Sequence, residues 1–168
     1  MDFLELAKER YSVRKFEARP IPQEAVNKIL AAGRLAPTAH NNQPQEIIVV
    51  QSEEALALLR KCTECHYEAP LAFIISYDKD RVWKRSYDGK DSGDVDASIV
   101  TAYMMTEAAD LGLGSCWVMY FIPEAVRVEF ELPENLEPVA ILLVGYAAGE
   151  PSPNHGKRRK TEEYVTYR

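Results

Sequence analysis

The longest helical pattern in the chain is VDASIVTAYMMTEAADLGL, residues 95–113. Its apolar side chains go nearly all the way round the expected helix and comprise Ile99, Val100, Ala102, Tyr103, Met104, Met105, Ala108, Ala109 and Leu111. A helix without a polar face has to be covered on every side. One small domain can hardly do that alone, so the pattern makes the 95–113 helix a candidate subunit interface.

Shorter patterns on both sides of residues 95–113 predict the remaining elements. Before it we expect helices over 2–9, 22–33 and 53–61, and strands over 47–50 and 71–77. After it we expect a strand over 115–118, a short helix over 123–130 and a central strand over 138–146. Asp2 with Glu5 resembles a capping box, and Pro22 opens the second helix. Because strands and helices alternate irregularly without an internal repeat, their order favours an α+β layered fold over a doubly wound one.

Length and composition bound the class of protein. The 168 residues are 46% hydrophobic, which predicts one globular domain over 1–168 with a real core. No basic segment precedes an apolar signal region and no apolar run reaches ~18 residues, so we expect a cytoplasmic protein without a membrane partner. The net charge of −6 argues against a nucleic acid partner. From residue 147 the chain turns polar, and this tail is either an extended arm that reaches across a partner or a frayed end.

The basic residues are unevenly distributed. One block near the N-terminus and one near the C-terminus hold Lys8, Arg10, Arg14, Lys15 and Arg19, and the run Lys157-Arg158-Arg159-Lys160. Two such blocks in an acidic chain suggest that separate segments converge on one small anion, for which a phosphate is the best candidate. A solvated helix face and a basic tail are the alternative that charge alone leaves open.

The cysteines carry a motif of their own. Cys62-Thr63-Glu64-Cys65-His66 matches the C-x-x-C-H pattern of covalent haem attachment. That chemistry belongs to exported proteins, and the sequence has no export signal, so reduced thiols and a chance match are favoured. A redox disulfide or a partial metal site is the alternative, although no second pair of ligands stands elsewhere in the sequence.

The familiar catalytic motifs are missing from the sequence. It has no G-x-S-x-G, no Walker loop and no G-x-G-x-x-G, because Gly112-Leu113-Gly114 lacks the third glycine. His40, His66 and His155 are scattered, without the carboxylate spacing of a triad or a metal site. A chain with a phosphate-binding signature but no nucleophile, base or metal cluster points to a cofactor that brings its own reactivity.

Four segments in register resemble the FMN-dependent nitroreductase family. Residues 9–16, ERYSVRKF, resemble its R-[R/Y/H]-S-x-[R/K]-x-F opening, and residues 36–44, APTAHNNQP, resemble its A-P-[S/T]-x-x-N-x-Q-P-W segment. Residues 111–118, LGLGSCWV, are similar to its L-G-L-G-[S/T]-x-W block, and residues 145–165 match its ending. Gln45 replaces the aromatic residue that usually follows Gln-Pro, and the chain is short for the family, so the substrate is left open.

The resemblance implies a central, mostly antiparallel sheet flanked by helices, and a C-terminal arm over 147–168 that reaches across a homodimer. It also implies that FMN is bound by Arg10, Tyr11, Ser12, Arg14, Pro37, Thr38, Ala39, Asn41, Gln43, Trp117, Val118, Met119, Arg158 and Arg159. The charged groups of both basic blocks would hold the phosphate. Arg14 would lie near N1 and O2 of the ring, where negative charge gathers on reduction.

Four of these residues also have a plain structural interpretation. Arg10 and Arg14 can be surface residues at a helix end, Asn41 can form an Asx-turn, and Trp117 can be core packing.

The activity implied is that of an NAD(P)H-dependent FMN oxidoreductase. NADH or NADPH passes hydride to flavin N5 and leaves, and a small electron-poor acceptor such as a nitroaromatic or a quinone takes its place. No side chain need act as nucleophile or general acid, so we expect neither a catalytic side chain nor a metal. A flavin protein with a narrow non-nitro substrate, or a flavin carrier or sensor, is the alternative.

Overall fold

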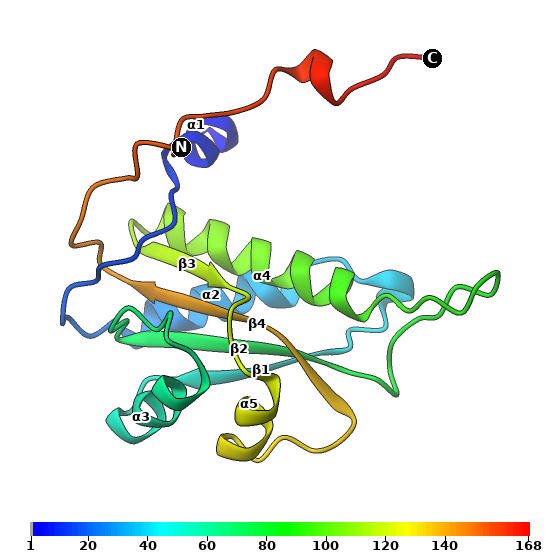
Figure 1. Cartoon of the computed structure of the whole chain (residues 1–168), viewed down its shortest axis with the longest axis horizontal. Coiled ribbons are helices and arrows are strands. Elements are labelled where there is room, and N and C mark those ends of the chain that lie inside the picture. The colour runs from blue at the N-terminus through cyan, green and yellow to red at the C-terminus, as the bar shows by residue number, and fades with distance from the viewer. Residues whose placement is uncertain (1) are drawn as a thin grey trace.

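The computed structural model describes residues 2–168 of the chain. Over these residues the chain forms five α-helices, two short 3-10 helices and a four-stranded sheet (Figure 1). In chain order the elements are α1 (Phe3–Glu9), α2 (Gln23–Leu35), η1 (Ala39–Asn41), β1 (Gln45–Val50), α3 (Glu53–Cys62), β2 (Leu71–Asp78), α4 (Gly93–Asp110), β3 (Gly114–Val118), α5 (Pro123–Glu129), β4 (Leu136–Gly145) and η2 (Thr161–Glu163).

Neighbouring strands of the sheet all run antiparallel, in the order β1-β2-β4-β3. β2 and β4 occupy the centre and are buried over nearly their whole length. Their sequences are continuous apolar runs because both faces of a central strand are covered here. The α+β class and the mostly antiparallel sheet are therefore confirmed.

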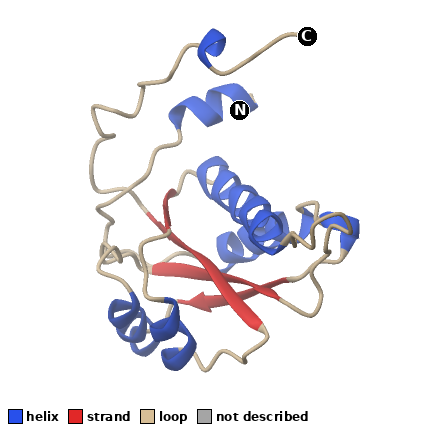
Figure 2. Cartoon of the chain, turned by 45° about the vertical axis from the view of Figure 1, so that its right-hand side comes forward, coloured by secondary structure: helices blue, strands red, loops and turns tan. Residues whose placement is uncertain are grey.

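Helices cover both faces of the sheet, which gives the molecule three layers (Figure 2). On one face, Phe73 and Leu142 of the sheet belong to the same core cluster as Met104 of α4. On the other face, Ile141 packs in a second cluster with Leu59 of α3. Since successive strand residues point to opposite faces, the single strand β4 contributes to both clusters.

Several element boundaries differ from the sequence expectation. α4 covers Gly93–Asp110 instead of 95–113, because Gly112 adopts a left-handed φ of 74° in the turn toward β3. β1 begins at Gln45, and α2 begins at Gln23 with Pro22 in the N-cap position. The capping box expected at Asp2 is wrong, because the Asp2 side chain makes no cap hydrogen bond.

One side of α4 is covered by its own chain and the other side is not. Ala97, Val100, Met104 and Ala108 are fully buried, whereas Tyr103 is 43% exposed. Beside Tyr103 there is an apolar groove of about 620 Å³, lined by residues of α1, α2 and α4: Phe3, Lys28, Ala31, Ala32, Leu35, Tyr103, Thr106 and Glu107. One copy of the chain therefore leaves part of this apolar helix without a partner.

The segments near the two ends of the chain lie together outside the three layers, and the C-terminal arm then extends away from the N-terminus (Figures 1 and 2). The hydroxyl of Tyr11 donates to the carbonyl of Gly149 at 2.7 Å, and the N–H of Ala148 donates to the carbonyl of Lys15 at 2.9 Å. Beyond these contacts, residues 150–168 run past α1 with η2 as their short helical turn. None of the helices within residues 2–168 is both long and apolar enough to span a membrane.

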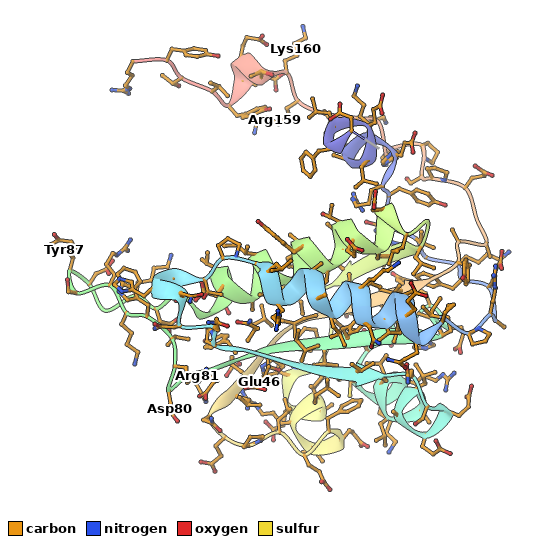
Figure 3. The ribbon with its side chains drawn as sticks, turned by 180° about the vertical axis from the view of Figure 1, so that it is seen from behind. Glu46, Asp80, Arg81, Tyr87, Arg159 and Lys160 are labelled. Atoms are coloured by element: carbon orange, nitrogen blue, oxygen red, sulfur yellow. The ribbon has the colours of Figure 1, made fainter. Side chains whose placement is uncertain are left out.

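A second excursion leaves the sheet between β2 and α4, over residues 79–92 (Figure 3). Its two limbs meet through a bridge between Lys84 and Asp91, and Arg85 pairs with Asp88 near the tip. Tyr87 at the tip is 95% exposed. The excursion is thus a small hairpin-like extension held by its own contacts.

Candidate functional site

The two basic blocks of the sequence meet at one pocket of about 340 Å³, which we call the cationic pocket. It lies where the end of α1 meets the C-terminal segment. Its lining consists of Arg10, Tyr11, Ser12, Arg14, Ser152, Asn154, His155 and Arg158. The lining contains arginines from both blocks and no Asp or Glu, so the pocket is suited to a small anion.

Backbone contacts hold the N-terminal half of the cationic pocket in place. Ser12 forms a parallel bridge with Ser115 of β3, and the N–H of Val13 donates to the carbonyl of Ser115 at 2.9 Å. Gly114 permits this close approach, since a Cβ on it would lie 2.5 Å from Cγ2 of Val13. The LGLG block of the sequence therefore allows the segment after α1 to lie against the sheet.

Side-chain contacts fasten the C-terminal half of the pocket onto this scaffold. Nε2 of His155 lies 2.7 Å from the carbonyl oxygen of Lys8, and the His155 ring meets that of Tyr11 edge-on, with centroids 5.9 Å apart. Nη1 of Arg158 donates to the carbonyl oxygen of His155 at 2.5 Å. The same nitrogen donates to the carbonyl oxygen of Lys157 at 2.8 Å, so the backbone of residues 155–157 holds the Arg158 guanidinium at the pocket.

The environment of the cationic pocket affects the pKa of the Arg10 guanidinium. Burial, and after it the positive charge of Arg158, holds the pKa of Arg10 below its ordinary value. Arginine stays protonated in proteins even so. Two cations held close together without a lining carboxylate are stabilised by an anion that binds between them.

The two other arginines predicted to bind FMN, Arg14 and Arg159, lie in different places. Arg159 lies on the arm with Lys160 (Figure 3), where its Nη2 donates to the carbonyl of Glu163 at 2.7 Å and it does not line the cationic pocket. Arg14 does line the pocket, and its charge also lies near Tyr67. The structure therefore brings Arg158, and not Arg159, to Arg10.

The second group of predicted contacts forms a strained loop before β1, which we call the 37–43 loop. His40, Asn41 and Gln43 have left-handed φ angles of 53°, 56° and 50°. Oγ1 of Thr38 accepts the N–H of Gln43 at 3.0 Å, and Nε2 of Gln43 donates to the carbonyl of Asn41 at 3.3 Å. Trp83 of the 79–92 excursion stacks on His40, with ring centroids 5.4 Å apart. Strain of this kind in residues other than glycine gathers at functional sites.

α4 separates the 37–43 loop from the cationic pocket. Near its N-terminus, Asp96 accepts the N–H of Ala39 at 2.8 Å. Near its C-terminus, Ala109 lines a small pocket together with Arg10. At 1.5 Å per residue, the helix from Asp96 to Ala109 spans about 20 Å. One copy of the chain thus does not bring Arg10 and Arg14 together with Pro37, Thr38, Ala39, Asn41 and Gln43.

The third group of predicted contacts, Trp117, Val118 and Met119, lies at the far end of β3 from Ser115. Val118 is buried among the core residues that face α3 and α5. Trp117, which points to the opposite face, is half-buried, and Met119 is 63% exposed. Side-chain contact with a ligand is therefore open to Trp117 and Met119, whereas Val118 can contribute only its main chain.

The C-x-x-C-H motif begins at Cys62, the last residue of α3, and residues 63–66 form a turn that contacts the segment after β3. Oγ1 of Thr63 donates to the carbonyl of Tyr120 at 2.5 Å and accepts the N–H of Cys65 at 3.0 Å. Burial raises the pKa of the Cys62 thiol to about 11, and burial also raises the pKa of Cys116. Within residues 2–168, no group of three or more His, Cys, Asp or Glu side chains is arranged to hold a metal ion.

Sequence reasoning misses Ser152, Asn154 and His155 of the cationic pocket, as well as Asp96 beside the 37–43 loop. His155 and its partner Lys8 are 147 residues apart, and Asp96 and Ala39 are 57 apart. No local pattern announces contacts over such separations. The polar, Pro/Gly-punctuated composition after residue 147 is the one signal that could have drawn attention to His155.

Comparisons with known proteins show what this arrangement is similar to. The sequence model described as "Nitroreductase family" matches residues 7–65 and 62–146. A protein of Methanothermobacter thermautotrophicus, provisionally named NADH dehydrogenase/NAD(P)H nitroreductase, is 32% identical over 166 residues, which cover 90% of this chain and 80% of the relative.

Solved structures agree with the sequence comparisons. The crystal structure of a nitroreductase family protein from Clostridium difficile 630 matches with a TM-score of 0.95 at 48% identity, over 99% of this chain and 98% of that chain. An FMN-dependent nitroreductase from Clostridium difficile R20291 matches with a TM-score of 0.80 at 27% identity, over 98% of each chain.

Proposed function

The chain belongs to the nitroreductase family, and from this premise we propose that it is an NAD(P)H-dependent FMN oxidoreductase that reduces a small electron-poor acceptor such as a nitroaromatic or a quinone. One related protein is named as FMN-dependent and another as an NAD(P)H nitroreductase. The observation that carries the function to this chain is the cationic pocket, where Arg10 and Arg158 face one another without a lining carboxylate.

The residues of the cationic pocket fit the phosphate of FMN. A phosphate monoester is nearly a dianion at neutral pH and accepts several charged hydrogen bonds. Arg10 and Arg158 supply guanidinium donors from two chain segments, and Ser12 and Ser152 supply hydroxyl groups. Arg159 is the weaker candidate, because its guanidinium is paired with Glu163.

A second copy of the chain completes the ring site. Because α4 separates the 37–43 loop from the cationic pocket, we place the ring between two copies of the domain of residues 1–168. Arg14 with Trp117–Met119 would come from one copy, and Asn41 and Gln43 from the other. A two-fold dimer through the apolar groove of α1, α2 and α4, with its axis perpendicular to α4, would bring opposite ends of the two α4 helices together.

The protein's own groups then bind and orient, and bound FMN supplies the electron transfer between nicotinamide and acceptor. Arg14 sets a positive charge beside the pyrimidine part of the ring, which favours the reduced ring. Asn41 and Gln43 offer amide donors and acceptors to its polar edge. The side chains need supply no nucleophile, and solvent can supply protons.

The purified protein tests this function directly. We expect a yellow protein with about one FMN per chain, whose flavin bands bleach anaerobically with NADH or NADPH and return with a nitroaromatic or a quinone. A colourless protein that FMN cannot reconstitute would refute the function. Bound FMN that neither nicotinamide reduces would instead favour a flavin carrier or sensor.

A further inference from the structure

Asp96 is a buried carboxylate that none of the roles above uses. It lies in the first turn of α4 and is 1% exposed. Its Oδ1 accepts the N–H of Ala39 at 2.8 Å, and its Oδ2 accepts the hydroxyl of Ser92 at 2.7 Å. Burying a carboxylate is costly even when neutral groups and a helix N-terminus stabilise it. A carboxylate buried at this depth is therefore expected to stabilise the structure that it contacts.

What Asp96 holds is the 37–43 loop. Ala39 is followed at once by His40 and Asn41, and then by Gln43, all three with left-handed φ. Such backbone persists in residues other than glycine only where surrounding contacts over-determine it. Two hydrogen bonds contribute here: the carboxylate of Asp96 accepts the N–H of Ala39, and Oγ1 of Thr38 accepts the N–H of Gln43 at the end of the loop. The side chain of Asn42 also donates to the carbonyl of Arg81, and Trp83 stacks on His40.

We propose, resting on the function proposed above, that Asp96 and Thr38 are positioning residues for the flavin ring. They hold Asn41 and Gln43 in the left-handed backbone that presents their amides to the pyrimidine edge. Asp96 acts through Ala39 and does not itself touch the flavin. Ser92 prevents the carboxylate from rotating away from Ala39, because it occupies the second oxygen.

The decisive variant is Asp96→Ala, measured against FMN and against riboflavin. We expect the affinity for both flavins to fall by the same factor, roughly tenfold, because ring hydrogen bonds and not phosphate contacts are lost. The visible circular dichroism of the bound flavin and its midpoint potential should shift as well. Asp96→Asn should restore most of the affinity, the spectrum and the potential, since an amide can accept from Ala39 and donate to Ser92.

Two further variants avoid an empty buried site at Asp96. Thr38→Val removes the hydroxyl that accepts the N–H of Gln43, and Ser92→Ala removes the hydroxyl that donates to Asp96. Both variants should shift the flavin spectrum and lower both affinities. Thr101→Val is the matched control, because Thr101 is fully buried on the same helix and its hydroxyl donates to the carbonyl of Ala97. Asp94→Ala controls for a carboxylate of the same turn that is exposed.

The outcomes separate this inference from the function on which it rests. Wild-type protein that binds flavin, with Asp96→Ala and Thr38→Val unchanged in affinity, spectrum and potential, overturns the positioning role alone. A loss of FMN affinity without loss of riboflavin affinity also overturns it, because the effect would then lie at the phosphate. Wild-type protein that binds neither flavin overturns the proposed function and this inference together.

Discussion

Two arginines from opposite ends of the chain, Arg10 and Arg158, face the same pocket. Burial, and after it the positive charge of Arg158, lowers the pKa of Arg10, as expected for two guanidinium groups that lie close enough to repel each other. An anion between them would offset the repulsion between the two positive charges. Their contributions to binding should therefore be coupled rather than independent.

Replacing Arg10 or Arg158 with Ala should weaken FMN binding roughly ten- to a hundredfold, since a hydrogen bond to a charged group contributes about 1.5–3 kcal/mol. The double variant should lose less than the sum of the single losses in free energy. Fluorescence titration of the apoprotein with FMN measures all three constants.

Riboflavin and Arg159→Ala are the controls for these variants. Riboflavin lacks the phosphate and should bind the wild type and both single variants equally well. Arg159→Ala should change FMN affinity far less, because Arg159 bonds to Glu163. Unchanged FMN affinity in Arg158→Ala would show that the C-terminal block is only a solvated basic run.

Cys62 makes stability depend on pH in the alkaline range. Its folded-state pKa is raised to about 11 from an ordinary value of 9.0, so the folded protein holds this proton more tightly than the unfolded chain. The resulting stabilisation is complete below pH 9 and is lost as the pH rises through 11. The advantage of wild type over Cys62→Ala in urea unfolding should therefore shrink between pH 8.5 and pH 11, and a constant difference would contradict this.

At the scale of elements, α4 organises the molecule. One side of α4 belongs to the core, and its N-terminal turn contacts the 37–43 loop through Asp96. Its C-terminal turn borders the small pocket that Ala109 lines together with Arg10. The first turn of α4 packs closely against the sheet. Gly93 there faces the ring of Tyr77, and a Cβ would lie 2.4 Å from Cε2 of that ring.

Gly93→Ala should destabilise the fold by roughly 1–3 kcal/mol, because either the ring of Tyr77 or the start of α4 has to move. Thermal and urea unfolding measure the loss. Gly156→Ala is the matched control, since a Cβ at Gly156 meets nothing within 4 Å. Equal stability of the two variants would mean that the start of α4 yields without cost.

At the scale of the whole molecule, two features favour a dimer: apolar side chains exposed at the groove, and predicted flavin-binding residues that lie far apart in one copy of the chain. Phe3 and Leu35 are 65% and 72% exposed beside the groove at α1, α2 and α4. The residues predicted to bind one flavin are split between the two ends of α4. A second copy packed on the groove would cover Phe3 and Leu35. It would also bring binding residues from one end of its own α4 beside those from the other end of the first copy's α4.

Mixed dimers test whether each site takes residues from both copies. One chain would carry Arg10→Ala with Arg158→Ala, and the other would carry Asn41→Ala with Gln43→Ala. Either variant alone should bind FMN weakly. In a mixed dimer one composite site regains all four native residues, so an equal co-expressed mixture should recover about a quarter of the wild-type FMN sites.

The absence of any recovery in the mixture would place each site within one copy of the chain. Sedimentation of the separate variants confirms that both still dimerise. The same runs provide the matched control, because a variant that fails to dimerise cannot be used in the mixture.

The amino-acid sequence by itself determined the α+β class, the central strands over 71–77 and 138–146, and the family. These follow from periodicity and short motifs, which are local properties. The sequence also suggested that the two basic blocks converge, because clustered like charges in an acidic chain need a counter-charge. It could not distinguish Arg158 from Arg159 as the phosphate ligand, because they are adjacent arginines in the same basic run.

Only the tertiary structure decided which of these groups meet. His155 reaches Lys8 and Asp96 reaches Ala39 across 147 and 57 residues of chain, and no local pattern encodes contacts over such separations. Arg159 instead turns to its near neighbour Glu163. The 37–43 loop and the cationic pocket each contain a recognisable motif, yet α4, which spans about 20 Å from Asp96 to Ala109, lies between them. Motifs in the sequence indicate which residues bind a ligand. The length of the rigid helix between those residues determines how far apart they lie in one copy of the chain.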